Sequence, residues 1–386
     1  MKGSFMAIGP AHTYIKNGTE KGFKQEELLA IYNSSLDVKR NSQTYIHSLN
    51  HLCHYSGSNY RYLRSVISRQ VECYDVYPIP KKSGGHRYIS SPNDELKVTQ
   101  RWLNKYVLAN IKPHWRCYSY HSEASIYKSA KEHCGSKWLI KMDIENFFDS
   151  VSEVVVYKMF RELGYKPLLS FELSRICTIE PEYVNKAMAG KWVNYNTGSD
   201  DLPYQRKNVK YFGRLPQGAP TSPAISNIIF TDIDEELQTF SEKNNLTYTR
   251  YADDICFSSH DKSFTRECAK LVIDFCTVVL RTNGYAAKKL KTKVIPPGVR
   301  KVVLGLNVDH DEPKLTKAYK KRLESHIRGI EEFNAVGHAE HKKFKSVFGM
   351  LEHVLGLINH ARLVEYGYAM KLLSRYNIAK QKQGFM

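Results

Sequence analysis

The stretch from residue 247 to residue 258 reads Thr247-Tyr248-Thr249-Arg250-Tyr251-Ala252-Asp253-Asp254-Ile255-Cys256-Phe257-Ser258. Both flanks are rich in residues that favour β-structure, so the stretch predicts a strand, a tight turn and a second strand. Because isolated ionised carboxylates are costly to bury, the two adjacent acids need cationic partners. Their hard oxygen ligands suit Mg²⁺, which binds one or two protein carboxylates together with substrate phosphates.

A third acid is expected from another strand. In phosphoryl transfer two metal ions roughly 3.5–4 Å apart clamp the attacking and leaving oxygens, and one turn with two acids cannot hold both ions. Asp143 fits best because it ends the apolar run Leu139-Ile140-Lys141-Met142, which predicts a short strand. Glu145 and Asp149 are the competing acids in this segment. A lone Asp after a strand would otherwise be read as a helix cap.

Charge and composition favour a polyanionic partner. The 386 residues include 57 Lys and Arg against 39 Asp and Glu, a net charge of +18. Neutralising phosphates supplies most non-specific affinity for nucleic acid, although a solvated basic surface is the simpler alternative. The eight cysteines are scattered, which indicates reduced thiols, and no apolar window is long enough for a signal peptide or a spanning helix. These features predict a cytoplasmic protein with no membrane partner.

The pattern along the chain predicts an α+β fold with an antiparallel sheet. Helical spacing marks residues 21–70, 95–111, 222–240 and 264–280. Two apolar arms around a Ser-Gly-Gly turn, from Tyr74 to Ile89, predict a β-hairpin with cations at its tip. The remaining expected elements are a strand at Trp138–Asp143, an inserted loop at 180–212, a basic strand after Asn283-Gly284, a strand at Val302–Val308 and a mostly helical tail at 313–380.

Cations and main-chain amides are predicted to bind the phosphates of a nucleoside triphosphate. Lys81 and Arg87 at the hairpin suit its charge. The segment Leu215-Pro216-Gln217-Gly218-Ala219-Pro220-Thr221-Ser222-Pro223 places a flexible main chain and an amide side chain ahead of a helix N-terminus. A Pro-Gly turn alone usually has no function beyond reversing the chain. Together with the predicted acids Asp143, Asp253 and Asp254, it is interpreted as part of a site.

Three ordered segments resemble the A, B and C motifs of reverse transcriptases: 141–150, 215–223 and 251–254. The resemblance is closest to the bacterial retron and group II intron branch, and it runs from about Tyr60 to about Tyr376. It implies a right-hand polymerase fold with fingers, a palm built on the antiparallel sheet and a helical thumb. The domains expected from it are an N-terminal helical extension at 1–70, fingers and palm at 71–312, and a basic thumb at 313–386.

The resemblance implies a role for each matching residue. Asp143, Asp253 and Asp254 take the places of the catalytic carboxylates that bind two Mg²⁺ ions, and Ile144 is included at the metal site. Phe148 takes the place of the aromatic gate that selects deoxynucleotides. Gln217, Lys81 and Arg87 match contacts to the incoming dNTP. Lys291 takes the place of the motif D lysine thought to protonate pyrophosphate, although Lys288 and Lys289 leave that register open.

Two further segments favour retrons. Ser129-Ala130-Lys131-Glu132-His133 and Val303-Leu304-Gly305 each differ by one residue from the retron signatures Asn-Ala-x-x-His and Val-Thr-Gly. A literal match at 334–338 lies far downstream and is interpreted as coincidence. For His133 we expect a packed or hydrogen-bonded side chain and not a catalytic role. The end of the chain soon after the thumb-like helices also fits retrons better than group II intron enzymes.

The implied function is that of a retron enzyme. It would prime from a 2′-hydroxyl of a guanosine in a cognate structured non-coding RNA and copy part of that RNA into DNA, giving a branched RNA–DNA hybrid (msDNA). Retrons are also associated with phage defence, in which a separate effector protein is held in check. The alternatives are another defence or intron-derived polymerase with a different template and primer, and a catalytically silent RNA-binding scaffold. A scaffold gains nothing from acids clustered against an anionic ligand.

Two other groups of residues are assigned from their patterns. The basic tail is expected to hold the nucleic-acid duplex through phosphate contacts from Lys320, Lys321, Arg322, Arg328, Lys342 and Lys343. A metal site at His47, His51, Cys53 and His54 is not favoured, because no second ligand pair follows at a zinc-finger distance. These histidines are interpreted as a polar helix face.

Overall fold

The computed structural model describes residues 11–40, 44–81, 84–180 and 212–385. By density of contacts the chain forms two compact units, which we describe separately. Unit 1 comprises Met1–Trp115, Ile144–Glu235 and Leu280–Ala286. Unit 2 comprises Arg116–Asp143, Glu236–Val279 and Ala287–Met386.

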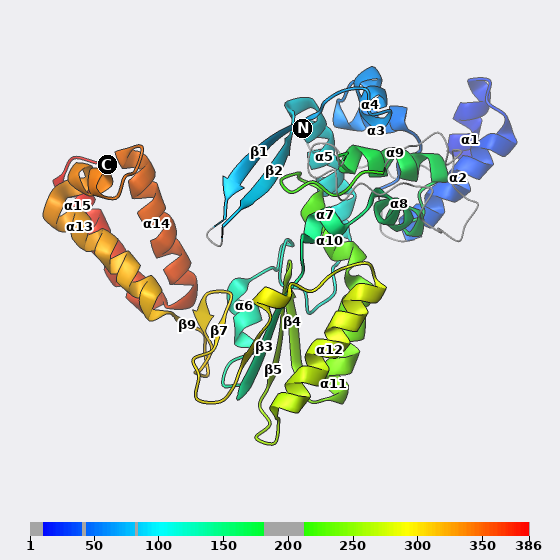
Figure 1. The fold of residues 1–386 in the computed structure, drawn as a ribbon. Coiled ribbons are helices and arrows are strands. Elements are labelled where there is room, and N and C mark those ends of the chain that lie inside the picture. The colour runs from blue at the N-terminus through cyan, green and yellow to red at the C-terminus, as the bar shows by residue number, and fades with distance from the viewer. Residues whose placement is uncertain (1–10, 41–43, 82–83, 181–211, 386) are drawn as a thin grey trace. The chain divides into compact units, whose positions relative to one another are not determined.

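Unit 1 is mainly helical and carries the predicted hairpin (Figure 1). Its elements are α1 (Ala11–Glu20), α2 (Gln25–Arg40), α3 (Leu49–Ser56), α4 (Tyr60–Ile67), β1 (Tyr74–Pro80), β2 (His86–Pro92), α5 (Asp94–Tyr106), the short 3₁₀ helix η1 (Leu108–Asn110), α7 (Phe147–Ser150), α8 (Glu153–Glu162), α9 (Pro167–Cys177) and α10 (Ser222–Ile229). The helices expected in 21–70 and 95–111 are confirmed. The expected loop at 180–212 lies almost wholly outside the described residues.

The start of α5 shows how local sequence sets an element in unit 1. Asn93 is the N-cap, and its side-chain Oδ1 accepts a hydrogen bond from the main-chain N of Leu96 at 3.0 Å. Asp94 and Glu95 follow in the first turn, where negative charge is favourable. The same Oδ1 accepts from the hydroxyl of Tyr62 in α4 at 2.7 Å. The cap therefore also joins two helices.

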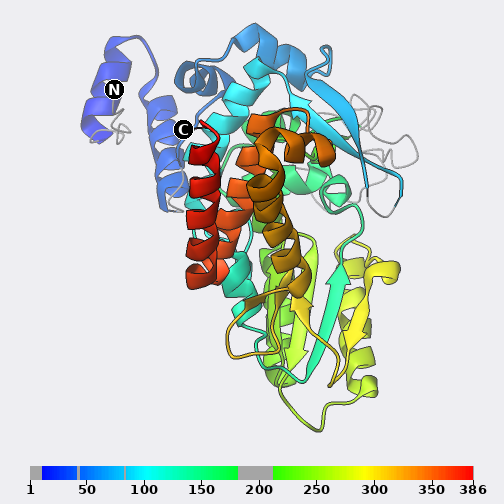
Figure 2. The ribbon, with the colours of Figure 1, turned by 90° about the vertical axis from the view of Figure 1, so that its left-hand side faces the viewer.

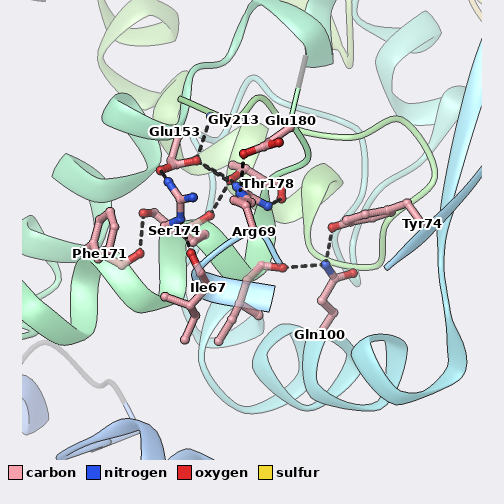
Figure 3. Close-up of polar contacts among 12 residues, drawn as sticks. Ile67, Arg69, Tyr74, Gln100, Glu153, Phe171, Ser174, Thr178, Glu180 and Gly213 are labelled. Atoms are coloured by element: carbon pink, nitrogen blue, oxygen red, sulfur yellow. Dashed lines mark hydrogen bonds and ion pairs between the residues drawn. The ribbon is translucent and has the colours of Figure 1, made fainter. Parts of the chain in front are cut away.

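A buried polar network around Glu153 joins several segments of unit 1 (Figure 3). Glu153 is fully buried and accepts hydrogen bonds from Arg69 Nη2 at 2.8 Å, Arg175 Nη1 at 3.0 Å and the main-chain N of Gly213 at 2.7 Å. Burial alone would raise the pKa of Glu153, but the charges of Arg175 and Arg69 lower it below its usual value. Removing one member of such a buried set leaves a charge without compensation.

Unit 2 contains the main sheet, a small second sheet and the C-terminal helices. Its elements are α6 (Ile126–Lys131), β3 (Trp138–Asp143), β4 (Thr247–Tyr251), β5 (Asp254–Ser259), η6 (Lys289–Lys291), β6 (Lys293–Ile295), β7 (Val302–Val303), β8 (Leu306–Asn307), β9 (Lys314–Leu315), α13 (Lys317–His341), α14 (Val347–Val364) and α15 (Tyr366–Lys382). Two helices, α11 (Thr231–Lys243) and α12 (Arg266–Thr282), pass from one unit into the other.

The main sheet has the strand order β4-β5-β3-β6, and every neighbouring pair is antiparallel. The predicted antiparallel sheet is therefore confirmed. β3 lies inside the sheet and is almost entirely buried, which explains why its sequence is apolar except for the half-buried Lys141 and the terminal Asp143. α11 and α12 lie along one side of this sheet and α6 along the other (Figure 1).

The structure corrects three expected elements. The strand expected at Val302–Val308 is two short strands, because Leu304 (φ 47°) and Gly305 (φ 85°) form a left-handed turn of the kind used in tight hairpins. The helix expected at 222–240 is two helices, α10 and α11, which meet at the buried Phe230. Both bury apolar residues, so the apolar spacing continues across the break. The basic strand after Asn283-Gly284 begins with the 3₁₀ helix η6 before β6.

The three C-terminal helices pack side by side (Figure 2), as the helical pattern predicts. Their shared core includes Leu323, Ile327, Val354 and Leu372. α13 is interrupted at Asn334, which has φ 60° and ψ 171°. Gln383 bonds to both sides of this interruption, since its Nε2 donates to the main-chain O of Ile330 at 2.8 Å and its Oε1 accepts from the N of Ala335 at 2.6 Å.

No helix within the described ranges has the length and apolar character that crossing a membrane requires.

Candidate functional site

The structure of unit 2 brings two of the predicted acids together. Asp143 is the last residue of β3 and Asp254 the first of β5, and the antiparallel register places them directly opposite each other. Opposite residues share one face of a sheet, with Cα atoms about 4.5–5.5 Å apart. Asp253 precedes Asp254 in the turn after β4. The alternatives Glu145 and Asp149 lie beyond the end of β3, outside the sheet.

Negative charge is concentrated at this point of the sheet. Asp143 is 5% exposed, and like charges directly opposite each other on neighbouring strands repel. Burial raises the pKa of Asp254 above its usual value, and the charges of Asp253 and Asp143 raise it further. Lys141, two residues before Asp143 on β3, opposes that rise. The arrangement is electrostatically unfavourable until a cation joins it.

Lys291 supplies a cation from within the chain. Its Nζ lies 2.5 Å from Asp143 Oδ2, and the main-chain N of Lys288 donates to the Asp143 main-chain O at 2.7 Å. Burial would lower the pKa of Lys291, but the hydrogen bond to Asp143 and the neighbouring carboxylates raise it. All three lysines of this segment are described, and Lys291 is the one whose side chain donates to the Asp143 carboxylate.

The carboxylates fit a hard divalent cation by their chemistry. In the described part of the chain, no three His, Cys, Asp or Glu side chains are grouped as the ligands of one ion are. The ammonium of Lys291 instead contacts the acid that ends β3. Oxygen-only ligands beside a basic counter-ion are compatible with Mg²⁺ and less so with softer metals. The side chain of Ile144 is buried at 1% exposure and offers no ligand atom.

The turn that carries Asp253 depends on a residue that the sequence reasoning missed. Ala252 has φ +56°, in the left-handed region that non-glycine residues rarely adopt. The guanidinium of Arg250 is fully buried, and its Nη1 donates to the main-chain O of Ala252 at 3.2 Å. A charged residue inside an otherwise apolar and hydroxyl-bearing strand pattern was the available signal.

His133 lies behind the same strands. Its side chain is fully buried, with Nδ1 2.7 Å from Ser258 Oγ on β5 and Nε2 2.7 Å from Thr249 Oγ1 on β4. Burial is the main reason that the pKa of His133 falls to about 3. The neutral imidazole therefore bridges the two strands that flank the acidic turn.

In unit 1, a hydrogen bond to the main chain of Gln217 holds that residue in place. The N of Ser90 on β2 donates to the Gln217 O at 2.8 Å. Gly218 follows with φ +120°, and a Cβ there would lie 2.9 Å from Ile89 Cγ2 and 3.1 Å from the Ser90 O. Only glycine permits both this conformation and this close approach.

The predicted phosphate-binding cations also lie on unit 1. Lys81 and Arg87 are both exposed, and Arg87 pairs with Ile79 across the β1–β2 hairpin. Because strand residues two apart share a face, Arg87 lies on the same face as Ile89, which approaches Gly218. Burial raises the pKa of Asp149, whereas Arg214 and Lys81 lower it. Lys81 therefore lies within electrostatic reach of the segment that contains Phe148.

The two adjacent phenylalanines of α7 have different environments. Phe147 is buried and packs edge-on against Phe230, with ring centroids 5.0 Å apart. Phe148 is partly exposed, and its ring centroid lies 5.4 Å from that of Phe147. Phe147 thus belongs to the core, whereas Phe148 packs against it and is partly exposed.

The predicted RNA-binding cations of the C-terminal helices are exposed, with one exception. Lys320 is half-buried, with its Nζ 2.6 Å from Glu365 Oε2 and 4.8 Å from the centre of the Tyr368 ring. The exposed members are Lys321, Arg322, Arg328, Lys342 and Lys343. Lys320 is therefore partly committed to a contact inside the protein.

The two retron-like segments meet in one apolar cluster of unit 2. Ala130 and Val303 are both buried in it, and Gly305 forms the adjoining β7–β8 turn. Tyr127 and Lys131 of α6 each donate to Glu312, at 2.5 Å and 2.7 Å.

The histidines near α3 form local contacts of their own. His51 Nδ1 accepts from the main-chain N of His47 at 3.1 Å, and the Tyr45 hydroxyl lies 2.9 Å from His47 Nδ1.

Comparisons with known proteins agree with this arrangement. Residues 79–308 match the family model described as reverse transcriptase (RNA-dependent DNA polymerase). The retron Mx162 reverse transcriptase of Myxococcus xanthus is 31% identical over 242 residues, which are 61% of this chain and 47% of that protein. The retron Ec86 reverse transcriptase of Escherichia coli is 25% identical over 308 residues, or 79% of this chain and 83% of that protein.

A solved structure of telomerase from Candida albicans with a fragment of telomeric RNA aligns with a TM-score of 0.41 at 15% identity, over 82% of this chain and 57% of that one. The chain spans about half the length of the Myxococcus relative, 47%, and most of the Escherichia relative, 83%. The family match covers more than half of the 386 residues. The protein therefore belongs to the reverse transcriptase family, and the two relatives named above are bacterial retron reverse transcriptases.

Proposed function

We propose that the protein is an RNA-directed DNA polymerase that copies part of a cognate structured RNA into DNA. The observation that carries this proposal is the pairing of Asp143 with Asp254 across β3 and β5, with Asp253 in the adjoining turn. Clustered acids are unfavourable for simple RNA binding, because they repel phosphate. They are useful to a protein that holds cations for phosphoryl transfer.

The roles of the residues follow from their chemistry. Asp143, Asp253 and Asp254 would hold two Mg²⁺ ions, which when bound stabilise charge on the attacking and leaving oxygens. Lys291, already within hydrogen-bond distance of Asp143, is suited to give a proton to the departing pyrophosphate. Lys81 and Arg87 bind the triphosphate, Gln217 contacts the nucleotide, and Phe148 excludes a ribose 2′-hydroxyl.

The retron part of the proposal concerns template and primer. Both named relatives are retron reverse transcriptases, and the two retron-like segments each contribute a buried residue, Ala130 and Val303, to one apolar cluster. The proposed reaction starts at a 2′-hydroxyl of the RNA and yields a branched RNA–DNA hybrid. A role in phage defence with a separate effector protein is part of the same proposal.

Exposed cations of the C-terminal helices are proposed to bind the RNA and its duplex with DNA. Lys321, Arg328, Lys342 and Lys343 are exposed and lie on α13 or directly after it. Each phosphate contact removed should lower the slope of log affinity against log salt by about 0.7–0.9. Substituting all four with glutamine should reduce that slope by about 3, and an unchanged slope would exclude them from the interface.

The decisive experiment separates catalysis from binding. Asp254→Asn should abolish DNA synthesis on an RNA template in Mg²⁺ and leave RNA affinity within about twofold, because the carboxylate is lost and the basic surface remains. Asp274→Asn, an exposed acid on α12, is the matched control and should behave as the wild type. Primer extension by Asp254→Asn at the wild-type rate would contradict the assignment.

The template and primer require a second measurement. Nucleic acid that copurifies with the protein should contain DNA joined to RNA at a branch that survives ribonuclease and yields to a debranching enzyme. DNA synthesis on RNA without any such branch would favour the second candidate, a defence or group II intron-derived reverse transcriptase.

A further inference from the structure

A segment outside the named strands lies along β4 in unit 2. Cys117 forms a parallel bridge with Arg250. The N of Arg250 donates to the Arg116 O at 2.9 Å, and the N of Tyr118 donates to the Arg250 O at 2.9 Å. Residues 116–118 therefore extend the main sheet at the edge strand that leads into the acidic turn.

The next residue, Ser119, forms a hydrogen bond with the turn that contains Ala252. Ser119 Oγ accepts a hydrogen bond from the main-chain N of Ala252 at 2.9 Å. The serine is fully buried, and its Oγ also lies 3.6 Å from Cys117 Sγ. Ala252 has φ +56°, a conformation that a residue with a Cβ holds only when its surroundings impose it.

Arg250 binds the main-chain oxygen of Ala252. Its buried Nη1 donates to the Ala252 O at 3.2 Å. Both main-chain polar atoms of Ala252 are thus bound by side chains, one from β4 and one from the segment beside it. The two residues that follow are Asp253 and Asp254. Because Asp253 and Asp254 directly follow Ala252, the main-chain conformation of Ala252 sets the direction in which the chain enters them.

We infer that Ser119 is a positioning residue for the carboxylates of Asp253 and Asp254. Its hydroxyl fixes the left-handed Ala252 and so sets the direction in which the two acids project. This inference rests on the proposed function, since it concerns the geometry with which those acids bind Mg²⁺. It adds to the site a residue that lies outside the sequences of all three motifs.

The size of the effect follows from one neutral hydrogen bond. Its net contribution corresponds to roughly a tenfold change in an equilibrium constant. Ser119→Ala should therefore weaken Mn²⁺ binding, measured by electron paramagnetic resonance without nucleotide, by about tenfold. The Mg²⁺ concentration for half-maximal synthesis should rise similarly, and the Ala252 amide should exchange with deuterium about tenfold faster.

The matched control is Ser241→Ala. Ser241 is also fully buried in unit 2, and its Oγ donates to the Leu237 O at 2.7 Å within α11. The substitution removes a comparable hydrogen bond and leaves the contacts of the Ala252 turn unchanged. It should leave Mn²⁺ affinity unchanged, because a loss of stability alone reduces the active fraction and not the affinity of the molecules that remain folded.

Ser119→Cys keeps the experiment informative if the alanine variant fails to fold. A thiol is moderately larger than the hydroxyl and is a weak acceptor. Under reducing conditions, which keep it from bonding to Cys117, the cysteine variant should fold and bind Mn²⁺ several-fold more weakly. Wild-type Mn²⁺ affinity and wild-type amide exchange in a folded Ser119 variant would overturn the inference. That result, combined with an inactive Asp254→Asn, would leave the proposed function intact. An active Asp254→Asn would instead remove the proposed site itself.

Discussion

Lys291 Nζ lies 2.5 Å from Oδ2 of Asp143, so a basic residue of η6 neutralises the acid that ends β3. The two residues are 148 positions apart in the chain, and β6, which follows η6, pairs with β3 and brings them together. A cation supplied in this way offsets part of the repulsion between Asp143 and Asp254. The same lysine is the residue for which we propose proton transfer to pyrophosphate.

Replacing Lys291 tests its role against its neighbours. Lys291→Ala should lower the rate of nucleotide incorporation by about 10²-fold, the lower end of the range for general acid catalysis, with little change in RNA affinity. Lys289→Ala, in the same 3₁₀ helix, is the control and should retain most of the rate. Rapid-quench measurement of single-nucleotide addition distinguishes the two, and equal losses in both variants would remove Lys291 from this role.

Phe148 should determine sugar selectivity. Phe148→Ala should raise the incorporation of ribonucleotides relative to deoxynucleotides by at least about tenfold. The reason is that the small alanine side chain, unlike the phenylalanine ring, does not crowd the 2′-hydroxyl. The ratio of kcat/KM for dGTP and GTP measures this. Phe147→Leu serves as the comparison, since Phe147 is buried in the core and its loss should lower stability while leaving the ratio unchanged. A wild-type ratio in Phe148→Ala would exclude the gate.

Alanine at Gly218 should impair nucleotide binding, whereas alanine at Gly356 should stabilise the protein. At Gly218 a Cβ would meet Ile89 Cγ2 at 2.9 Å in a left-handed main chain, so Gly218→Ala should raise the KM for dNTP strongly. Gly356 lies within α14, and no neighbouring atom comes within 4 Å of the place that a Cβ would take, so Gly356→Ala should stabilise the protein by about 0.5–1 kcal/mol. Steady-state kinetics and urea unfolding check the pair, and a Gly218→Ala enzyme with normal KM would refute the close approach.

Glu153→Gln should be among the most destabilising single changes in unit 1. The amide removes the negative charge that two buried arginines share, and breaking a buried ion pair in this way costs about 3–5 kcal/mol. Urea unfolding at neutral pH should show that loss. Glu162→Gln, on the same helix α8, provides the control, and a loss below about 1 kcal/mol for Glu153→Gln would show that Arg69 and Arg175 are satisfied without it.

His133 should make the folded state sensitive to acid. Its pKa is about 3 when folded and near 6.5 when unfolded, so below pH 6.5 the unfolded chain binds the extra proton. Its contribution to stability is therefore complete above pH 6.5 and declines as the pH falls from 6.5 toward 3. Between pH 7.5 and 5.5 the wild type should lose about 1.4 kcal/mol more than His133→Gln. Equal losses in the two proteins would contradict the low folded pKa.

Local patterns were sufficient to predict much of the fold. Alternation and apolar runs identified β3, β4 and β5, because a strand with one or two buried faces must present apolar residues at fixed positions. The same reasoning failed where one local conformation interrupts a continuous apolar pattern. Leu304 and Gly305 adopt left-handed conformations that split an expected strand, and Phe230 separates two helices that bury apolar residues on either side of it.

The order of the motifs, the acids that they carry and the basic character of the chain can be read directly from the residues, because these are properties of residue type and spacing. Which side chains contact each other depends on the folded chain. The pairing of β3 with β5 sets Asp143 against Asp254, and that of β3 with β6 brings Lys291 to Asp143. The contact of Ser119 with Ala252 likewise joins residues 133 positions apart. Such contacts depend on strand register and burial across the whole sheet, which no short window of sequence contains.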